Sequence, residues 1–362
     1  MIQLKPAQAS DSNKLLALLE STPQQGIVTL NFERQPNFFH GAEIASQQPF
    51  ITLAEDESTG NAVAVYSNGK RDVFVNGKRR AIRYAHDLRI AKNHRGKHLI
   101  QDVIEESQKV MEPDEYSQIV ILEENAASLT AVASGRSGLA TFHPYGKLVT
   151  YIMSTTYDFA PKSSLTIRRA DNADIPAIQT LFNREAANKQ FYPVYDFQRI
   201  GKDSYYRGLS ISDYFLAFEN NMLVGFIGTW RQKDFKQTRV VEYPPWMIFL
   251  RPFYNIWCTF FGGFPLPLKK SVADYVSLHS IITQDNRPDI LSGLLSYVRR
   301  SLSSSGDKTM ILGIADNDPI KAATKGFIYR TMKSNHYLAG FGEDARKSLD
   351  HTRPLYIEVS RL

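Results

Sequence analysis

The alternation of apolar and polar residues predicts a succession of strands and helices that occurs twice along the chain. In the first occurrence, alternation over 82–90 predicts a strand, a polar turn covers 92–98, and apolar residues at three- and four-residue spacing predict a helix over 99–111. Asn76-Gly77, between two apolar runs, predicts a hairpin immediately before this strand. This part of the chain therefore reads as hairpin, turn and amphipathic helix.

The same units recur in the same order in the second half of the chain. Without gaps, the opening strand and helix of the chain match a segment that begins near residue 165, and the strand-turn-helix matches a later segment. Agreement in one unit could arise by chance, whereas agreement in the order of all units favours an internal repeat. The matched pairs include Ile2 and Leu165, Leu4 and Ile167, Asp11 and Asp174, Ile90 and Ile282, Arg95 and Arg287, Leu99 and Leu291, and Asn125 and Asn317.

The repeat predicts two tandem domains of the α/β (α+β) class. Each is expected to contain a mixed, mostly antiparallel sheet flanked by helices. We place the first half at 1–155, a linker at 156–164, where Pro161 and two serines occur, and the second half at 165–362. The second half carries an aromatic insertion at 233–272 that has no counterpart in the first.

The insertion is apolar and aromatic from Tyr243 to Leu268, with Arg251 as its single charge. Its prolines and paired glycines interrupt any helix long enough to cross a bilayer. Burial in the core or in an interface with the other half or a second chain is one interpretation. A lid over an apolar acceptor or acyl pocket and a patch that contacts a membrane surface are the others.

Composition narrows the ligand class only moderately. The formal net charge of +6 favours anionic ligands, whether nucleotide phosphates, membrane or nucleic acid. No long Lys/Arg run interleaved with aromatic residues is present, so no nucleic acid is expected, and no cluster with metal-ligand spacing predicts a metal. The lone Cys258 and the absence of an apolar signal core at the N-terminus indicate a cytoplasmic protein.

The turn at 92–98 is basic and precedes a helix, which makes it a candidate anion site. The first backbone N–H groups of a helix have no intrahelical partner, and they can bind a phosphate or pyrophosphate. A solvated cationic turn is the plain alternative.

This strand-turn-helix resembles the pyrophosphate motif of the GNAT superfamily of N-acetyltransferases, in which Arg/Gln-x-x-Gly-x-Gly/Ala joins a strand to a helix. The resemblance implies acetyl-CoA, or another acyl-CoA, as cofactor. Two positions depart from the pattern, because His98 and Ile100 occupy the glycine positions. The residues that correspond to the motif are Arg95, Gly96, Lys97, His98, Leu99 and Ile100.

The resemblance also implies further contacts to the cofactor. The strand before the turn diverges from its neighbour in this family and binds the pantetheine arm through its backbone, which here means Leu88, Arg89 and Ile90. Asn125 follows the next strand, where the family often has a cofactor-binding Asn, and Ser128 lies one turn further on. An Asn at this place could equally cap a helix with no ligand present.

Amide formation from a thioester needs a base for the acceptor ammonium and an acid for the departing thiolate. Asp87 is our candidate base; His86 lies in the same part of the strand, and strand alternation predicts that only one of them faces the cleft. The family often uses a tyrosine in this region as the acid, and the resemblance implies Tyr145 as our candidate, with Tyr151 as the other tyrosine. Structural alternatives exist for each, and for Asp87 the alternative is an ion pair with a neighbouring arginine.

The second half departs further from the family motif. Pro288 and Asp289 replace Gly96 and Lys97, so a backbone donor is lost and an anion is introduced where a pyrophosphate would bind. We therefore expect the cofactor in the first half, with the second half as a degenerate partner that supports it or completes its acceptor site.

The resemblance implies an acyl-CoA-dependent N-acyltransferase, and we expect acetyl-CoA to donate the acyl group by direct attack of an amine. The acceptor would be a small-molecule or peptide amine, and the oligomeric state is left open. Alternative functions are a non-catalytic acyl-CoA sensor and an N-acyl amino acid synthase-like enzyme that uses longer acyl donors.

Overall fold

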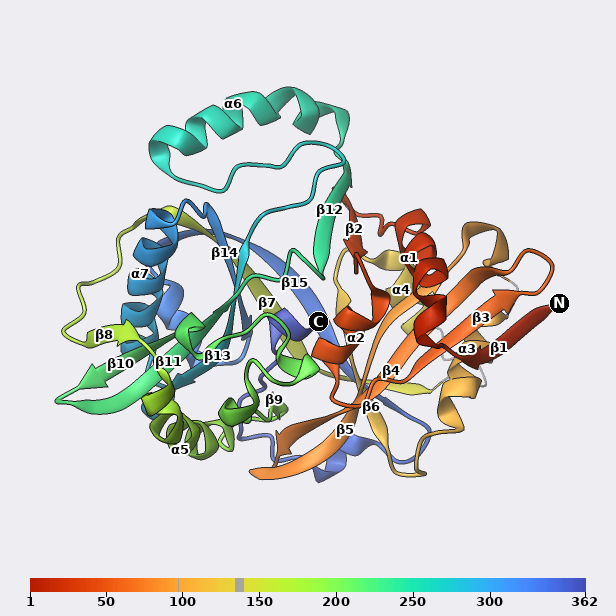
Figure 1. Cartoon of the computed structure of the whole chain (residues 1–362), viewed down its shortest axis with the longest axis horizontal. Coiled ribbons are helices and arrows are strands. Elements are labelled where there is room, and N and C mark those ends of the chain that lie inside the picture. The colour runs from red at the N-terminus through yellow and green to blue at the C-terminus, as the bar shows by residue number, and fades with distance from the viewer. Residues whose placement is uncertain (97, 134–139) are drawn as a thin grey trace.

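A computed structural model describes residues 1–96, 98–133 and 140–362. Its main feature is one long twisted sheet that runs through the whole molecule (Figure 1). The strands of the first half in this sheet are β1 (Ile2–Pro6), β3 (Ile51–Asp56), β4 (Asn61–Val75), β5 (Lys78–Ile90), β6 (Tyr116–Leu122) and β7 (Thr141–Asp158). Those of the second half are β8 (Thr166–Arg169), β10 (Tyr214–Glu219), β11 (Met222–Trp230), β13 (Val276–Thr283), β14 (Thr309–Ala315) and β15 (Phe327–Gly340).

The strand order is β1-β3-β4-β5-β6-β15-β7-β14-β13-β11-β10-β8. The β5–β6 and β13–β14 pairs are parallel, and each is connected through a helix, whereas the other pairs are antiparallel. The predicted mixed, mostly antiparallel α/β architecture is therefore confirmed. The hairpin at Asn76-Gly77 is also confirmed, since both residues have positive φ between β4 and β5.

The last strand of each half lies in the part of the sheet that belongs to the other half. β15, from the second half, pairs with β6, and β7, from the first half, pairs with β14. β7 and β15 also pair with each other along most of their length. Because β7 continues to Asp158, the expected linker at 156–164 begins inside a strand.

Helices cover both faces of the sheet. In the first half, Val65 packs with α1 and α2, while its neighbours Ala64 and Tyr66 pack with α3, so these helices lie on opposite faces. In the second half, α5 and α7 contribute to the largest core. The helices are α1 (Ser12–Ser21), α2 (Phe38–Ala45), α3 (Leu99–Gln108), α4 (Ala126–Ala133), α5 (Ile175–Ala186), α6 (Pro245–Phe261) and α7 (Pro288–Ser304).

Smaller pairings connect the halves a second time. β2 (Thr29–Glu33) and β12 (Gln237–Glu242) form a separate two-stranded sheet, and β9 (Tyr192–Pro193) pairs with β4. The expected insertion at 233–272 thus contains a strand that binds the first half and the helix α6. Within the described residues, no helix is both long and apolar enough to cross a bilayer.

The C-terminal segment enters the centre of the molecule (Figure 1). Arg361 is fully buried; its Nε donates to the Tyr195 hydroxyl at 3.0 Å, and its Nη1 donates to the backbone oxygens of Tyr205 and Ile44. The guanidinium also stacks 3.6 Å from the ring centroid of Tyr205. These contacts join the C-terminal segment to both halves of the chain.

We expect Arg361→Met to lower the free energy of unfolding by about 3 kcal/mol, because two backbone oxygens and a hydroxyl would be left buried without their donor. Urea unfolding followed by circular dichroism measures this. The exposed Arg80 is the matched control, since Arg80→Met should change stability by less than about 0.5 kcal/mol. Equal unfolding midpoints for the two variants would contradict the anchoring role of Arg361.

Candidate functional site

The predicted cofactor strand diverges from its neighbour. β5 and β6 pair only from Arg83 to Ala85, yet β5 continues to Ile90 and β6 to Leu122. Just after the last pair, Asp87 has φ of 50° and the pairing of β5 with β4 shifts register, which marks a bulge. The predicted residues Leu88, Arg89 and Ile90 lie beyond this bulge, in the diverging part of the strand.

The basic turn follows directly and ends at the start of α3. Gly96 has φ of 78°, and a Cβ at this position would meet no atom within 4 Å. His98, at a position where the family motif has glycine, has φ of 59°, a left-handed conformation that favours glycine. Arg95 and His98 are exposed, whereas Leu99 is buried and fixes the helix start to the core. Gly96 and His98 thus both have a glycine-like backbone, and His98 directly precedes the first N–H groups of α3, which have no intrahelical partner. Lys97 lies outside the described residues.

Arg95 and its counterpart Arg287 have different surroundings. Arg287 binds two carboxylates, Glu219 at 3.0 Å and Asp289 at 2.6 Å. Arg95 forms no salt bridge with a described carboxylate, and its Nε lies 3.5 Å from the backbone oxygen of Ile90. A guanidinium without a protein anion is available to a phosphate, while one bound to two carboxylates is not.

Two strands of the second half, β13 and β14, diverge in the same way, but there the C-terminal segment of the chain bonds to the backbone of β13. β13 and β14 pair only at Val276 and Ser277, and Ser280 has positive φ like Asp87. The backbone N–H of Ser280 donates to Glu358 at 2.9 Å, and that of Ile281 donates to the Tyr356 hydroxyl. The backbone groups that correspond to the predicted pantetheine contacts are therefore already bonded to the protein.

Asp87 and His86 lie together rather than on opposite sides of the strand. His86 Nδ1 is 3.1 Å from Asp87 Oδ2, and Arg34 Nη2 is 3.2 Å from Asp87 Oδ1. The bulge at Asp87 interrupts the strand alternation on which the expectation of a single side chain facing the cleft was based, and it lets the two side chains contact each other. The partner of Asp87 is Arg34, which precedes it by 53 residues, and not an adjacent arginine.

The charges of this pair follow from their surroundings. Burial alone would raise the pKa of Asp87, but Arg34 and the hydrogen bond from His86 hold that pKa well below its ordinary value. Burial lowers the pKa of His86 despite the opposing effect of Asp87. An ionised Asp87 can only accept, so Nδ1 of a neutral His86 carries the proton and Nε2 is left as a basic lone pair.

Stacking fixes the ring of His86. It lies on the Tyr84 ring with centroids 5.1 Å apart, and the Arg71 guanidinium lies 4.0 Å from the centroid of the same Tyr84 ring. Arg71 donates to Gln118 at 2.8 Å, which ties this stack to β6. His86 Nε2 makes no hydrogen bond to any described residue, so it is free to accept a proton.

Lys236, which precedes β12, reaches the same region from the second half. Its Nζ donates to the backbone oxygen of Ser360 at 3.0 Å. Burial, reinforced by the nearby Arg34, lowers the pKa of Lys236 to about 7. Sequence spacing gave no signal for Arg34 or Lys236, because tertiary packing brings them to Asp87, Arg34 from the first half and Lys236 from the second.

Asn125 and Ser128 are brought together as a helix cap. The Asn125 side-chain oxygen accepts from the backbone N–H of Ser128 at 3.2 Å, in front of α4. The capping alternative is therefore observed, and a cofactor contact by either residue stays a prediction.

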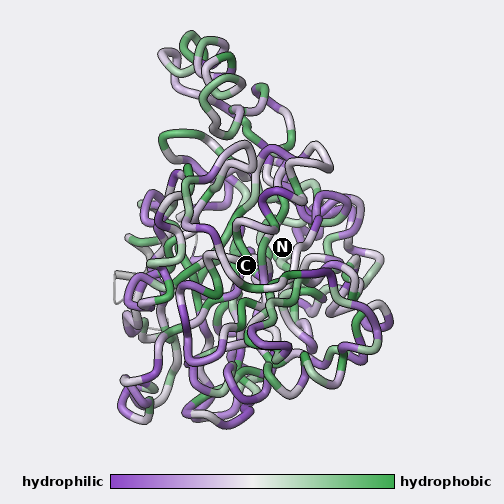
Figure 2. Tube along the Cα trace, turned by 90° about the vertical axis from the view of Figure 1, so that its left-hand side faces the viewer, coloured by the Kyte–Doolittle hydropathy of each residue, from purple (hydrophilic) through white to green (hydrophobic). Residues whose placement is uncertain are grey.

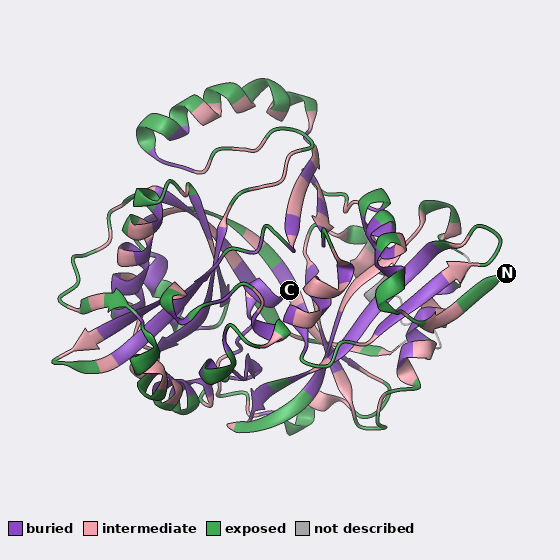
Figure 3. Cartoon of the chain, in the orientation of Figure 1, coloured by how far each residue is buried: buried purple, intermediate pink, exposed green. Residues whose placement is uncertain are grey.

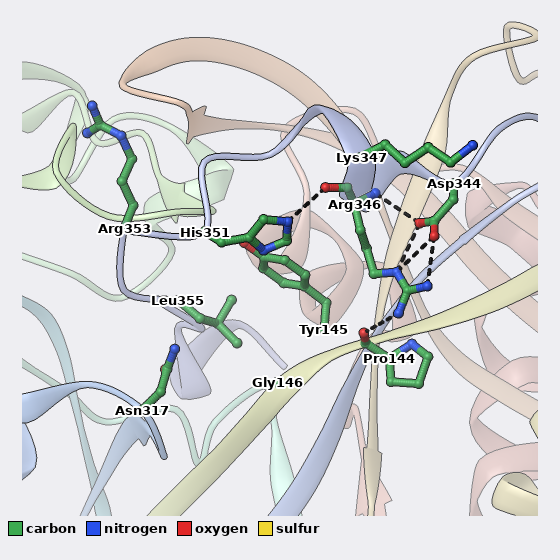
Figure 4. A pocket seen from close by; sticks show the side chains of 10 residues that line it. All are labelled: Pro144, Tyr145, Gly146, Asn317, Asp344, Arg346, Lys347, His351, Arg353 and Leu355. Carbon is green, nitrogen blue, oxygen red and sulfur yellow. Dashed lines mark hydrogen bonds and ion pairs between the residues drawn. The ribbon is translucent and has the colours of Figure 1, made fainter.

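Tyr145 lies in a different place from the basic turn. It lines a cavity of about 520 Å³ whose other walls come from β7, from Asn317 and from the segment 344–355 (Figure 4). Its ring packs against Phe191, His336 and His351, and it makes no hydrogen bond or ring contact with the described residues of the turn. A role for Tyr145 as the acid stays a prediction. In this cavity Arg346 is already bound to Asp344, so an anion would have to compete with that carboxylate.

Asp87→Asn is expected to destabilise the protein by about 3 kcal/mol at pH 7, because Arg34 would remain buried without its anion. Since the folded-state pKa of Asp87 is depressed, its contribution is present above about pH 4 and is lost as the pH falls below that. Urea unfolding between pH 7 and pH 3 should show a weaker pH dependence for the variant. Glu57→Gln, at an exposed carboxylate, is the control, and identical pH dependence in Asp87→Asn and wild type would refute the pairing.

No family model matches the sequence, and no curated protein matches it. Solved structures do match the fold. N-myristoyltransferase of Saccharomyces cerevisiae with bound myristoyl-CoA matches 98% of this chain and 85% of its own, with a TM-score of 0.60 and 12% identity. A GCN5-related N-acetyltransferase from Anabaena variabilis matches 93% and 72%, with a TM-score of 0.53 and 10% identity. A probable N-acyltransferase from Enterococcus faecalis matches 93% of this chain and 72% of its own, with a TM-score of 0.52 and 10% identity. The chain therefore has the fold shared by GCN5-related N-acetyltransferases and N-myristoyltransferases.

Proposed function

We propose that this protein is an acyl-CoA-dependent N-acyltransferase whose cofactor binds the first half, residues 1–155. One contrast carries the proposal. In the first half, the turn that follows β5 carries Arg95, which has no described carboxylate partner, whereas Arg287 and the backbone of β13 are occupied by the protein itself. The second half, 165–362, then supports the first and contributes to the acceptor side through Lys236 and the C-terminal segment.

The residues of the turn fit a pyrophosphate. Arg95 supplies charge, and the positive φ of Gly96 and His98 opens the backbone in front of α3. The diverging residues Leu88 and Ile90 would bind the pantetheine arm. Acyl-CoA would supply the thioester carbonyl that an amine attacks.

Residues of this chain then remove the proton from the acceptor ammonium. His86 Nε2 takes a proton from the acceptor ammonium, and Asp87 holds the imidazole through Nδ1–H and stabilises the charge that forms. Arg34 keeps Asp87 ionised throughout. Lys236 is the second candidate for this role, because its lowered pKa leaves part of it neutral near pH 7.

Acetyl-CoA is the donor that the motif predicts. A longer acyl donor is the second candidate, and the likeness to a fold that binds myristoyl-CoA in the yeast enzyme favours it. The acceptor in either case is a small-molecule or peptide amine.

Arg95→Gln should weaken CoA binding about tenfold, because a charge-assisted contact to phosphate is lost. Arg287→Gln is the matched control and should leave the affinity unchanged. Calorimetry with CoA, acetyl-CoA and myristoyl-CoA measures both variants and compares the donors. The absence of CoA binding in the wild type, or equal losses in both variants, would refute a cofactor site in the first half.

His86→Gln should lower kcat by about 10² to 10⁴ while leaving CoA affinity unchanged. Burial lowers the pKa of His86 below 6.5, so His86 is already neutral above that pH. For a given acceptor, kcat/KM should therefore increase little as the pH rises above 6.5. If Lys236 were the base instead, kcat/KM would rise through about pH 7 and Lys236→Met would abolish that rise. Binding of CoA without turnover on a panel of amines would instead indicate an acyl-CoA sensor.

A further inference from the structure

The helix α6 projects from the rest of the molecule with its aromatic side chains in solvent. Figures 1 and 2 show the helix apart from the sheet, connected by β12 and a returning segment, and Figure 3 shows its outer side as exposed. The aromatic residues of this outer side are 49% to 70% exposed. They are Trp246, Phe249, Phe253, Trp257, Phe260 and Phe261.

The polar side of α6 faces the protein instead. Asn255 donates to the backbone oxygen of Leu266 at 3.0 Å and accepts from its N–H at 2.8 Å. Arg251 also donates to Leu266, and Cys258 is buried against Gly263. The returning segment thus satisfies the polar groups and leaves the apolar side without a partner, the reverse of a helix on a water-soluble core.

The shape and charge of this surface favour a lipid layer. At about 100° per residue, the six aromatic residues cover an arc of about 120°, which is wider than the seam of a two-helix contact. Between Tyr243 and Leu268 there is no carboxylate, and two exposed lysines follow at once. Lys269 pairs with Glu242 at 3.1 Å, whereas Lys270 forms no salt bridge with a described carboxylate. Tryptophan rings prefer the headgroup level of a bilayer, and lysines beside it are attracted to anionic lipid.

We propose that α6 lies flat in the surface of an anionic membrane, with its aromatic side inserted below the headgroups. Lys270 contacts the headgroups, and the returning segment joins the helix to the body. This inference is independent of the proposed acyl transfer, and either can fail without the other.

Co-sedimentation of the full chain with phosphatidylcholine vesicles that contain phosphatidylserine tests the proposal. The wild type should bind, and Trp246→Ser/Trp257→Ser should reduce partitioning about tenfold or more. Ile27→Ser/Met222→Ser removes two equally exposed apolar residues elsewhere and should leave binding unchanged. Lys269→Gln/Lys270→Gln should weaken binding to the anionic vesicles and reduce its dependence on salt.

Fluorescence provides a second readout without a variant. The chain has three tryptophans, and Trp230 is 1% exposed, so a blue shift on addition of vesicles reports Trp246 and Trp257. Light scattering without lipid shows whether a second copy covers α6 instead. Failure of the wild type to bind, unchanged binding in the tryptophan variant, or a dimer that this variant dissociates without any vesicle binding would overturn the proposal.

Discussion

The pairing of β15 with β6 and of β7 with β14 is the constraint on which the rest of the structure depends. Each half would otherwise end its sheet at β6 or β14, with a row of unpaired backbone groups. Exchange of the last strands satisfies both edges with one continuous ladder. The separate pairing of β12 with β2 also joins the halves, and Lys236, which precedes β12, lies near Asp87. The candidate site thus combines residues that neither half contains alone.

The two halves use similar frameworks for different purposes. In the second half, Glu358 and Tyr356 bind the backbone beyond the bulge at Ser280, and the space between the diverging strands is part of the core. In the first half, the bulge instead places Asp87 in contact with Arg34 and His86. The same burial keeps His86 neutral and lowers the pKa of Lys236, while Arg34 keeps Asp87 ionised.

Local features of the fold could be predicted from the sequence because they depend on local residues. The Asn76-Gly77 hairpin, the strand-turn-helix and the order of units follow from turn chemistry and apolar spacing. The strand exchange could not be predicted, since the apolar and polar pattern of β7 and of β15 would be the same whether each strand paired with its own half or with the other half. Of the candidate site, the basic turn was predictable, whereas the contact between His86 and Asp87 depends on a single positive φ. Arg34 and Lys236 become neighbours of Asp87 only through tertiary packing.

Strand exchange also sets an order of events during synthesis. The edge of β6 emerges from the ribosome roughly two hundred residues before β15, its partner. Until then this edge is an open template for other strands, and the pairing that closes it is among the most non-local in the chain. The first half therefore cannot complete its sheet until β15 has been synthesised, and a chaperone that shields exposed strand edges would act on this interval.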